Sequence, residues 1–80
     1  MRTKVLAAIY AIVKENPNAP LHAKNISSVL GCEDQEVQEL FETLLEEELI
    51  EKKYASLSIY RITLKGMLDA GEAFKEYWQG

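Results

Sequence analysis

The apolar positions in the first half of the chain predict three helices, and their spacing is clearest in the first. There they lie three or four residues apart, as one face of a helix requires: Val5, Leu6, Ile9, Ile12 and Val13. Asn16 and Pro17 follow this stripe. Because proline disfavours the helical conformation in the residue before it, the first helix is expected to end there.

Two further helices are predicted on either side of a glycine turn. Residues 23–30 form a short helix whose apolar side chains are expected to face inward: Ile26, Val29 and Leu30. Gly31 is placed to end this helix in the left-handed conformation that glycine adopts readily. The third helix is predicted from about residue 34 to about residue 47, with one apolar face: Val37, Leu40, Phe41, Leu44 and Leu45.

After residue 48 the pattern predicts a two-stranded hairpin. Leu49 and Ile50 no longer fall on the apolar stripe of the third helix, and residues 51–54 and 59–63 are expected to be strands that residues 55–58 connect. In the second strand, Tyr60 and Ile62 alternate with their neighbours.

A last helix is predicted over residues 64–79. A stripe of Leu64, Met67 and Leu68 is expected to cover the core of the protein. With no internal repeat or low-complexity segment, residues 1–80 are expected to form a single domain.

Three pieces of the sequence, in this order, resemble one known superfamily. The Leu-Gly-Cys run at residues 30–32, with Val37 six positions after the glycine, is similar to the helix-turn-helix core of small transcription regulators. Residues 44–53 look like that superfamily's passage from helix to wing, and residues 60–66 resemble its second wing strand entering the next helix. The chain therefore resembles the winged-helix superfamily, which implies an α+β, mostly α fold: a winged helix-turn-helix with three helices, a two-stranded wing and a C-terminal helix.

The chain departs from this resemblance in backbone and charge. The superfamily commonly has glycine where this chain has Glu48, a position that often needs a left-handed backbone. A glutamate there is expected either to cost about 1 kcal/mol of strain or to move the boundary of the element. Glu33 stands where a Ser or Thr helix cap is usual, and residues 55–58 carry no basic residue at the tip of the wing. The match to the fold is therefore closer than the match to the DNA-contacting chemistry.

Charge is distributed unevenly along the chain. Residues 33–51 contain nine of the thirteen acids and no Lys or Arg, so the remaining residues carry nine bases and four acids, a net charge of +5. The chain as a whole carries −4. The third helix is therefore expected to present an acidic face that repels phosphates, which supply most of the affinity in DNA binding.

Three interpretations of this acidic face are open: a solvated face that serves solubility, a surface for a protein partner, or a helix that reads bases. The leading hypothesis is a non-enzymatic regulatory module that binds a basic protein surface. Its predicted interaction residues are Glu36, Glu39, Glu42 and Glu46. The alternative is a DNA-binding transcriptional regulator, which charge disfavours. Its predicted contact residues are Lys24, Gln35, Gln38, Lys52, Lys53 and Arg61.

The end of the last helix predicts a homodimer. Phe74, Tyr77 and Trp78 crowd this end, and a domain this small has little core left to cover them. The other interpretation, that the aromatic residues fold back on the first helix, stays open.

The sequence contains no recognisable catalytic, metal or cofactor motif. His22 has no second histidine or cysteine pair nearby, Cys32 is the only cysteine, and Ser27 and Ser28 have no base or acid at a defined spacing. An enzyme, a metal site and a cofactor are therefore not expected. No apolar run is long enough to span a bilayer, and Lys14-Glu15-Asn16-Pro17 stands where a signal peptide would need a cleavage site. A cytoplasmic protein is expected.

Overall fold

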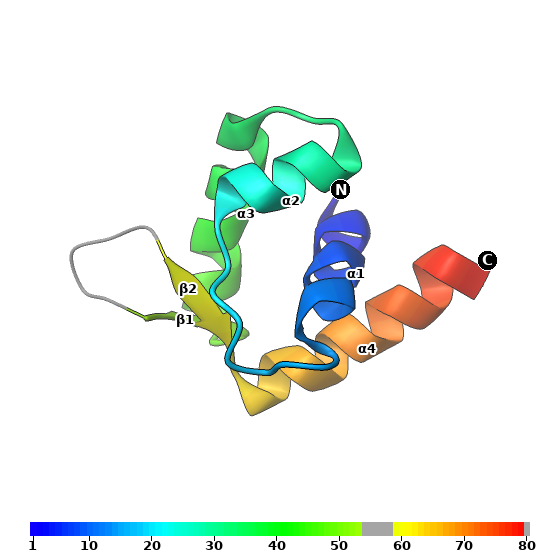
Figure 1. The fold of residues 1–80 in the computed structure, drawn as a ribbon. Helices are drawn as coiled ribbons and strands as arrows, with labels where there is room; N and C mark the ends of the chain where they lie inside the picture. The colour runs from blue at the N-terminus through cyan, green and yellow to red at the C-terminus, as the bar shows by residue number, and fades with distance from the viewer. Residues whose placement is uncertain (54–58, 80) are drawn as a thin grey trace.

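The computed structural model describes residues 1–53 and 59–79, with the side chains of residues 78 and 79 excepted. Within these residues the fold is α+β and mostly helical, with four helices and one two-stranded antiparallel sheet (Figure 1). The elements follow the order α1 (Arg2–Val13), α2 (Ala23–Leu30), α3 (Asp34–Glu46), β1 (Ile50–Lys52), β2 (Tyr60–Ile62) and α4 (Leu64–Gln79). Figure 1 shows the sheet beside α3 on one side of the molecule and α4 against α1 on the other.

The predicted elements are confirmed with small shifts at their ends. The bounds of α2 and α4 are as predicted, α1 begins already at Arg2, and both strands are shorter than expected. Residue 54, predicted to end the first strand, lies outside the described residues, as does the predicted connection 55–58. Gly31 ends α2 with a φ of +71°, as the sequence predicts for a left-handed helix stop.

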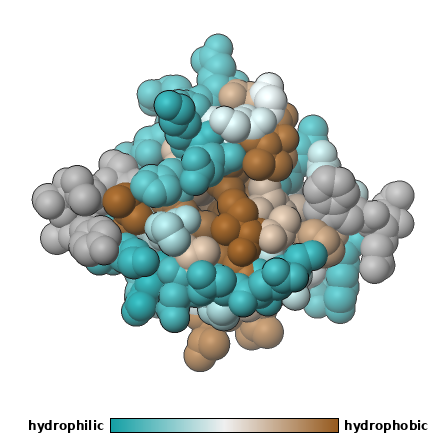
Figure 2. All heavy atoms as spheres, viewed as in Figure 1, coloured by the Kyte–Doolittle hydropathy of each residue, from teal (hydrophilic) through white to brown (hydrophobic). Residues whose placement is uncertain are grey.

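The hydrophobic core lies between α1, α3, the sheet and α4. Its largest fully buried side chains come from the segments that precede β2 and α4: Ile9, Leu21, Ile26, Phe41, Leu44, Leu49 and Ile50. The Phe41 ring meets the Tyr60 ring edge-on, with 5.2 Å between centroids. Figure 2 shows apolar atoms in the middle of one face of the molecule, framed by polar side chains. The packing of α3 against the sheet therefore fixes which side of α3 remains exposed.

A third backbone segment extends the sheet. β1 and β2 pair in a register that places Glu51 opposite Arg61. On the other edge of β2, Leu21 and Tyr60 exchange two hydrogen bonds, with nitrogen–oxygen distances of 2.7 and 3.0 Å. The sequence did not predict this bridge, because a single paired residue leaves no alternating pattern. It ties the start of α2 to the sheet and places α2 beside α3.

The passage from α3 into β1 has the left-handed backbone expected at Glu48, where φ is +63°. Thr63, between β2 and α4, closes this corner. Its hydroxyl donates to the Glu48 carbonyl oxygen at 2.7 Å and accepts a hydrogen bond from the Gly66 backbone N–H at 3.0 Å. Thr63 is thus the N-cap of α4, although the sequence placed it in a strand.

Predictions of inward-facing residues were wrong at three positions. Val29 is 65% exposed, Leu64 is 89% exposed and Leu68 is 73% exposed. In α4 the cause is the contact of Gly66 with the backbone of Leu49, where a Cβ on Gly66 would lie 1.8 Å from the Leu49 carbonyl oxygen. Residue 66 is therefore the inward point of the first turn, and Leu64, about 200° around the helix from it, faces outward.

Small side chains form the inward face of α4 further along. Ala70 and Ala73 are buried, and Met67 packs against the same core. Their small size allows α4 to lie close to α1, whereas the sequence predicted that larger residues would fill this interface.

Candidate interaction surfaces

The exposed side of α3 is acidic along its whole length. Its apolar face is buried through Val37, Phe41 and Leu44, which turns the opposite face to solvent. The four predicted interaction residues all lie on the exposed part of the helix: Glu36, Glu39, Glu42 and Glu46. Gln35 lies beside them and donates to Glu39 Oε1 at 3.3 Å. The sequence prediction of an exposed acidic face is therefore confirmed in its geometry.

The two arginines that form ion pairs bind acids outside α3. Arg2 at the start of α1 makes a bidentate ion pair with Glu47, at 2.7 and 2.8 Å between nitrogen and oxygen. Arg61 pairs with Glu51 across the sheet. Across residues 1–53 and 59–79, these are the ion pairs present, and neither involves the exposed acids of α3. That face therefore keeps its negative charge uncompensated by neighbouring Lys or Arg.

The predicted DNA contacts fall into two groups. Lys24, Gln35 and Gln38 line a shallow depression where α2 and α3 begin, together with His22 and Asp34. Gln38 also donates to the Tyr60 hydroxyl at 3.1 Å, which holds its side chain against the sheet.

The second group lies on the sheet. Lys52 is exposed at the end of β1, and the Lys53 ammonium lies 3.4 Å from the Asn18 carbonyl oxygen. Arg61 belongs to a different groove, where its guanidinium is already paired with Glu51. Lys24, Gln35 and Gln38 thus share one depression and Arg61 lines a separate groove, while Lys52 and Lys53 line neither of these two hollows. The structure does not unite the predicted contacts in one basic surface.

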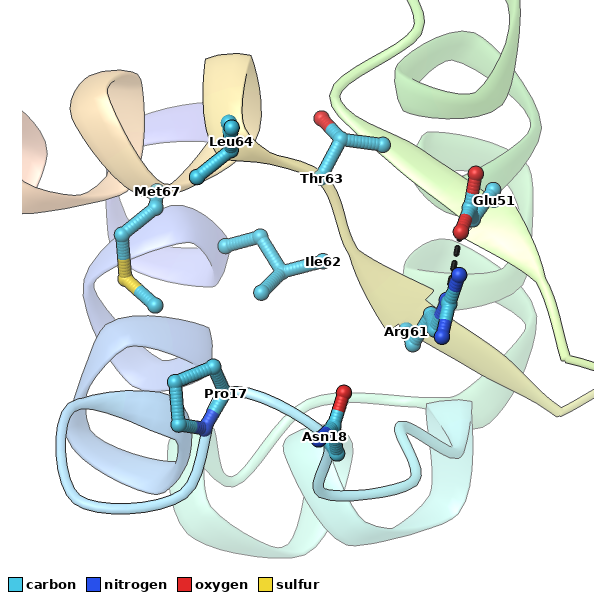
Figure 3. Close-up of a pocket in the computed structure, with 8 residues that line it drawn as sticks. All are labelled: Pro17, Asn18, Glu51, Arg61, Ile62, Thr63, Leu64 and Met67. Atoms are coloured by element: carbon cyan, nitrogen blue, oxygen red, sulfur yellow. Dashed lines mark hydrogen bonds and ion pairs between the residues drawn. The ribbon is translucent and has the colours of Figure 1, made fainter.

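The groove that holds Arg61 runs between the α1–α2 connection and the first turn of α4. Figure 3 shows Ile62 and Met67 between Leu64 on one side and Pro17 on the other, with the Glu51–Arg61 pair at the far end. Its floor is apolar and its end is charged. Sequence reasoning missed this groove, because its residues come from three segments that only the tertiary fold brings together.

The aromatic residues of α4 meet α1. The Phe74 ring packs on the Tyr10 ring with 5.1 Å between centroids, and the Lys14 ammonium lies 5.5 Å from the centre of the Phe74 ring. Tyr77 is 38% exposed, and the side chain of Trp78 lies outside the described residues. Phe74 therefore makes a contact within the chain, as the second interpretation of the aromatic end expects.

His22 and Ser27, two polar residues that the sequence offers as candidates for chemistry, lie at the start of α2 and on its buried side. His22 is the N-cap residue of α2, but its side chain makes no capping hydrogen bond. Ser27 is buried, and its hydroxyl lies within hydrogen-bond reach of two acceptors, the Lys24 carbonyl oxygen at 3.0 Å and the Asp34 carboxylate, to either of which it can donate its one hydrogen. Asp34, seven residues after Ser27, is the first residue of α3. The contact of Ser27 with Asp34 joins α2 to the start of α3.

Among the residues that the structure describes, no three His, Cys, Asp or Glu side chains gather in a way that would hold a metal ion. None of the helices in this part of the chain is long and apolar enough to cross a bilayer.

Comparisons of the chain with models of protein families, with characterised proteins and with solved structures found no match.

Proposed function

We propose that this chain is a winged-helix module that binds a protein with a basic surface through the exposed acids of α3. The observation that carries the proposal is the uncompensated charge of this face. Glu36, Glu39 and Glu42 stand exposed on one rigid helix, while the arginines Arg2 and Arg61 pair with acids outside it. Charges held on a rigid scaffold steer an oppositely charged partner and select against a like-charged one.

The winged-helix assignment is supported by the order and pairing of the elements. After α1, the short α2 ends at the left-handed Gly31 and the longer α3 follows, and an antiparallel hairpin then leads into the last helix. This is the arrangement that the resemblance of residues 30–32, 44–53 and 60–66 implies. One fold hosts many roles, so the function rests on the charge of α3 and not on the fold.

DNA binding is the second candidate, because Lys24, Gln35 and Gln38 line one depression beside α3. Amide side chains can bind adenine edges, but affinity for DNA comes mainly from neutralised phosphates. Asp34 stands in the same depression, and the exposed acids of α3 continue from it. A duplex approaching this side would meet more negative than positive charge, which favours a protein partner over DNA.

The test compares proteins captured by the unmodified chain and by a variant that loses three α3 charges: Glu36→Gln, Glu39→Gln and Glu42→Gln. The matched control removes three charges from exposed acids outside α3: Glu15→Gln, Asp69→Asn and Glu76→Gln. A partner identified by mass spectrometry should be basic, should be retained by the control and should be lost by the α3 variant. Equal capture by both variants would contradict the proposal.

A titration with random duplex DNA, followed by fluorescence anisotropy at two salt concentrations, separates the two candidates. Binding should be weaker than the ~10⁻⁴–10⁻⁶ M that DNA-binding proteins show for non-specific DNA. Micromolar binding that weakens steeply with salt would favour the DNA-binding alternative.

A further inference from the structure

The outer side of the first turns of α4 is unusually apolar for an exposed surface. Leu64 and Leu68 lie four residues apart, so they occupy the same side of the helix, and they are 89% and 73% exposed. All other leucines in the described part of the chain are buried or half-buried. Two neighbouring leucines held in water are typical of an interaction surface, because their exposure costs hydrophobic free energy.

Hollows flank these two leucines. On one side lies the groove of Figure 3, to whose lining Leu64 and Met67 contribute together with Ile62 and Pro17. On the other, a hollow of about 460 Å³ lies over Gly71, which has no side chain to fill it. Its walls combine the apolar side chains of Tyr10, Met67, Leu68 and Phe74 with the charged residues Glu72 and Lys75. The surface therefore has projecting leucines next to hollows that are partly apolar and partly charged.

The charges on α4 indicate what covers this surface. Lys65 is exposed in the first turn, and Glu72 is exposed two turns later on the same side as Leu68. A second α4 lying antiparallel would bring each Lys65 opposite the Glu72 of the other copy, whereas a parallel copy would bring like charges together. Antiparallel helices also place opposite ends of their dipoles side by side. Lys65 is available for this contact, since its ammonium makes only an exposed hydrogen bond, 3.2 Å from the Glu47 carbonyl oxygen.

We propose that the face of α4 around Leu64 and Leu68 is a self-association surface that binds a second copy of this chain in antiparallel orientation. The two Leu68 side chains meet near a twofold axis. Each Leu64 then reaches the hollow over Gly71 of the other copy, so every contact occurs twice, as a symmetric dimer requires. This surface is distinct from the acidic face of α3, which both copies leave exposed to other partners.

The proposal places the dimer nearer the start of α4 than the sequence did. The sequence predicted an interface of Phe74, Tyr77 and Trp78, but the Phe74 ring is packed on Tyr10 of the same chain. Leu64 and Leu68, in contrast, are exposed in the isolated chain, so burying them needs no rearrangement. Two leucines per copy form a small hydrophobic centre, so we expect an association in the micromolar range, within reach of the concentrations tested below.

Sedimentation equilibrium over a range up to several hundred micromolar tests this proposal. The unmodified chain should form dimers. The dimer dissociation constant of the variant Leu64→Gln with Leu68→Gln should be about tenfold higher or more. The matched control is Val29→Gln, which removes an exposed aliphatic side chain from α2 and should leave the dimer unchanged. Circular dichroism should show all variants folded, because none of the three side chains is buried.

Charge reversal tests the antiparallel orientation independently of the leucines. Lys65→Glu or Glu72→Lys alone should weaken association, and the two together should restore it, since the pair is then exchanged. A chain that stays monomeric throughout the range, a leucine variant that dimerises like the unmodified chain, or a charge pair that fails to restore association would each overturn the proposal. If Tyr77→Ala disrupts the dimer and the leucine variant does not, the interface lies at the aromatic end of α4 and the proposal is wrong.

Discussion

Replacing Glu48 with glycine should stabilise the protein. Glu48 holds a left-handed backbone with φ +63° where α3 turns into β1. A side chain in this conformation costs roughly 1–2 kcal/mol, whereas glycine adopts it freely. The Glu48 side chain is exposed, and its backbone carbonyl, which accepts the Thr63 hydrogen bond, would remain in place. The substitution therefore removes strain without removing a contact that the structure shows.

The expected gain is smaller than the strain itself. Glycine loses more conformational freedom on folding than other residues, which offsets about 0.5–1 kcal/mol. The remaining net gain is about 1 kcal/mol or somewhat less, to which the loss of one charge among Glu46, Glu47 and Glu51 adds a few tenths. In a domain of this size, about 1 kcal/mol raises Tm by roughly 4–8 °C.

Urea melts of three proteins separate strain from charge: the unmodified chain, Glu48→Gly and Glu48→Ala. Alanine removes the charge but keeps the strain, so the difference between the glycine and alanine variants measures the backbone contribution alone. Glycine should exceed alanine by about 1 kcal/mol at unchanged m-value. If alanine is as stable as glycine or more so, the left-handed conformation is not strained and the reasoning fails.

Four further substitutions test neighbouring parts of the fold by urea melts. Gly66→Ala should cost about 2 kcal/mol or more, because its Cβ would lie 1.8 Å from the Leu49 carbonyl oxygen. Gly71→Ala, whose Cβ would make an ordinary 3.4 Å contact with Tyr10, should be neutral or stabilising. Equal effects of the two substitutions would mean that α4 can move away from Leu49. Thr63→Ala should cost about 1 kcal/mol through the lost N-cap of α4, and no loss would show that water replaces the hydroxyl. Glu42→Lys should stabilise by a few tenths of a kcal/mol by relieving repulsion on α3, and a loss above about 1 kcal/mol would reveal a specific contact of Glu42.

Local interactions explain what could be predicted from the sequence. A helix is specified by the spacing of its own apolar residues and by its end signals, so α2 and α4 appear where the pattern places them and α2 ends at Gly31. The exposed acids of α3 follow from the same periodicity, since a helix that buries Val37 and Phe41 must turn the opposite side to water. The left-handed backbone at Glu48 was foreseeable as well, because the motif around it resembles one with glycine at that position.

Tertiary contacts decided how each element is rotated and what it meets. Periodicity shows which residues share a face of α4, but not which face meets the core. The close approach of Gly66 to the Leu49 backbone decided that, and it left Leu64 and Leu68 in water. The Leu21–Tyr60 bridge and the Arg2–Glu47 ion pair join residues about forty positions apart, a separation that carries no local signal. The candidate surfaces depend on these rotations and long-range pairings, because a side chain can serve in recognition only where packing has left it exposed.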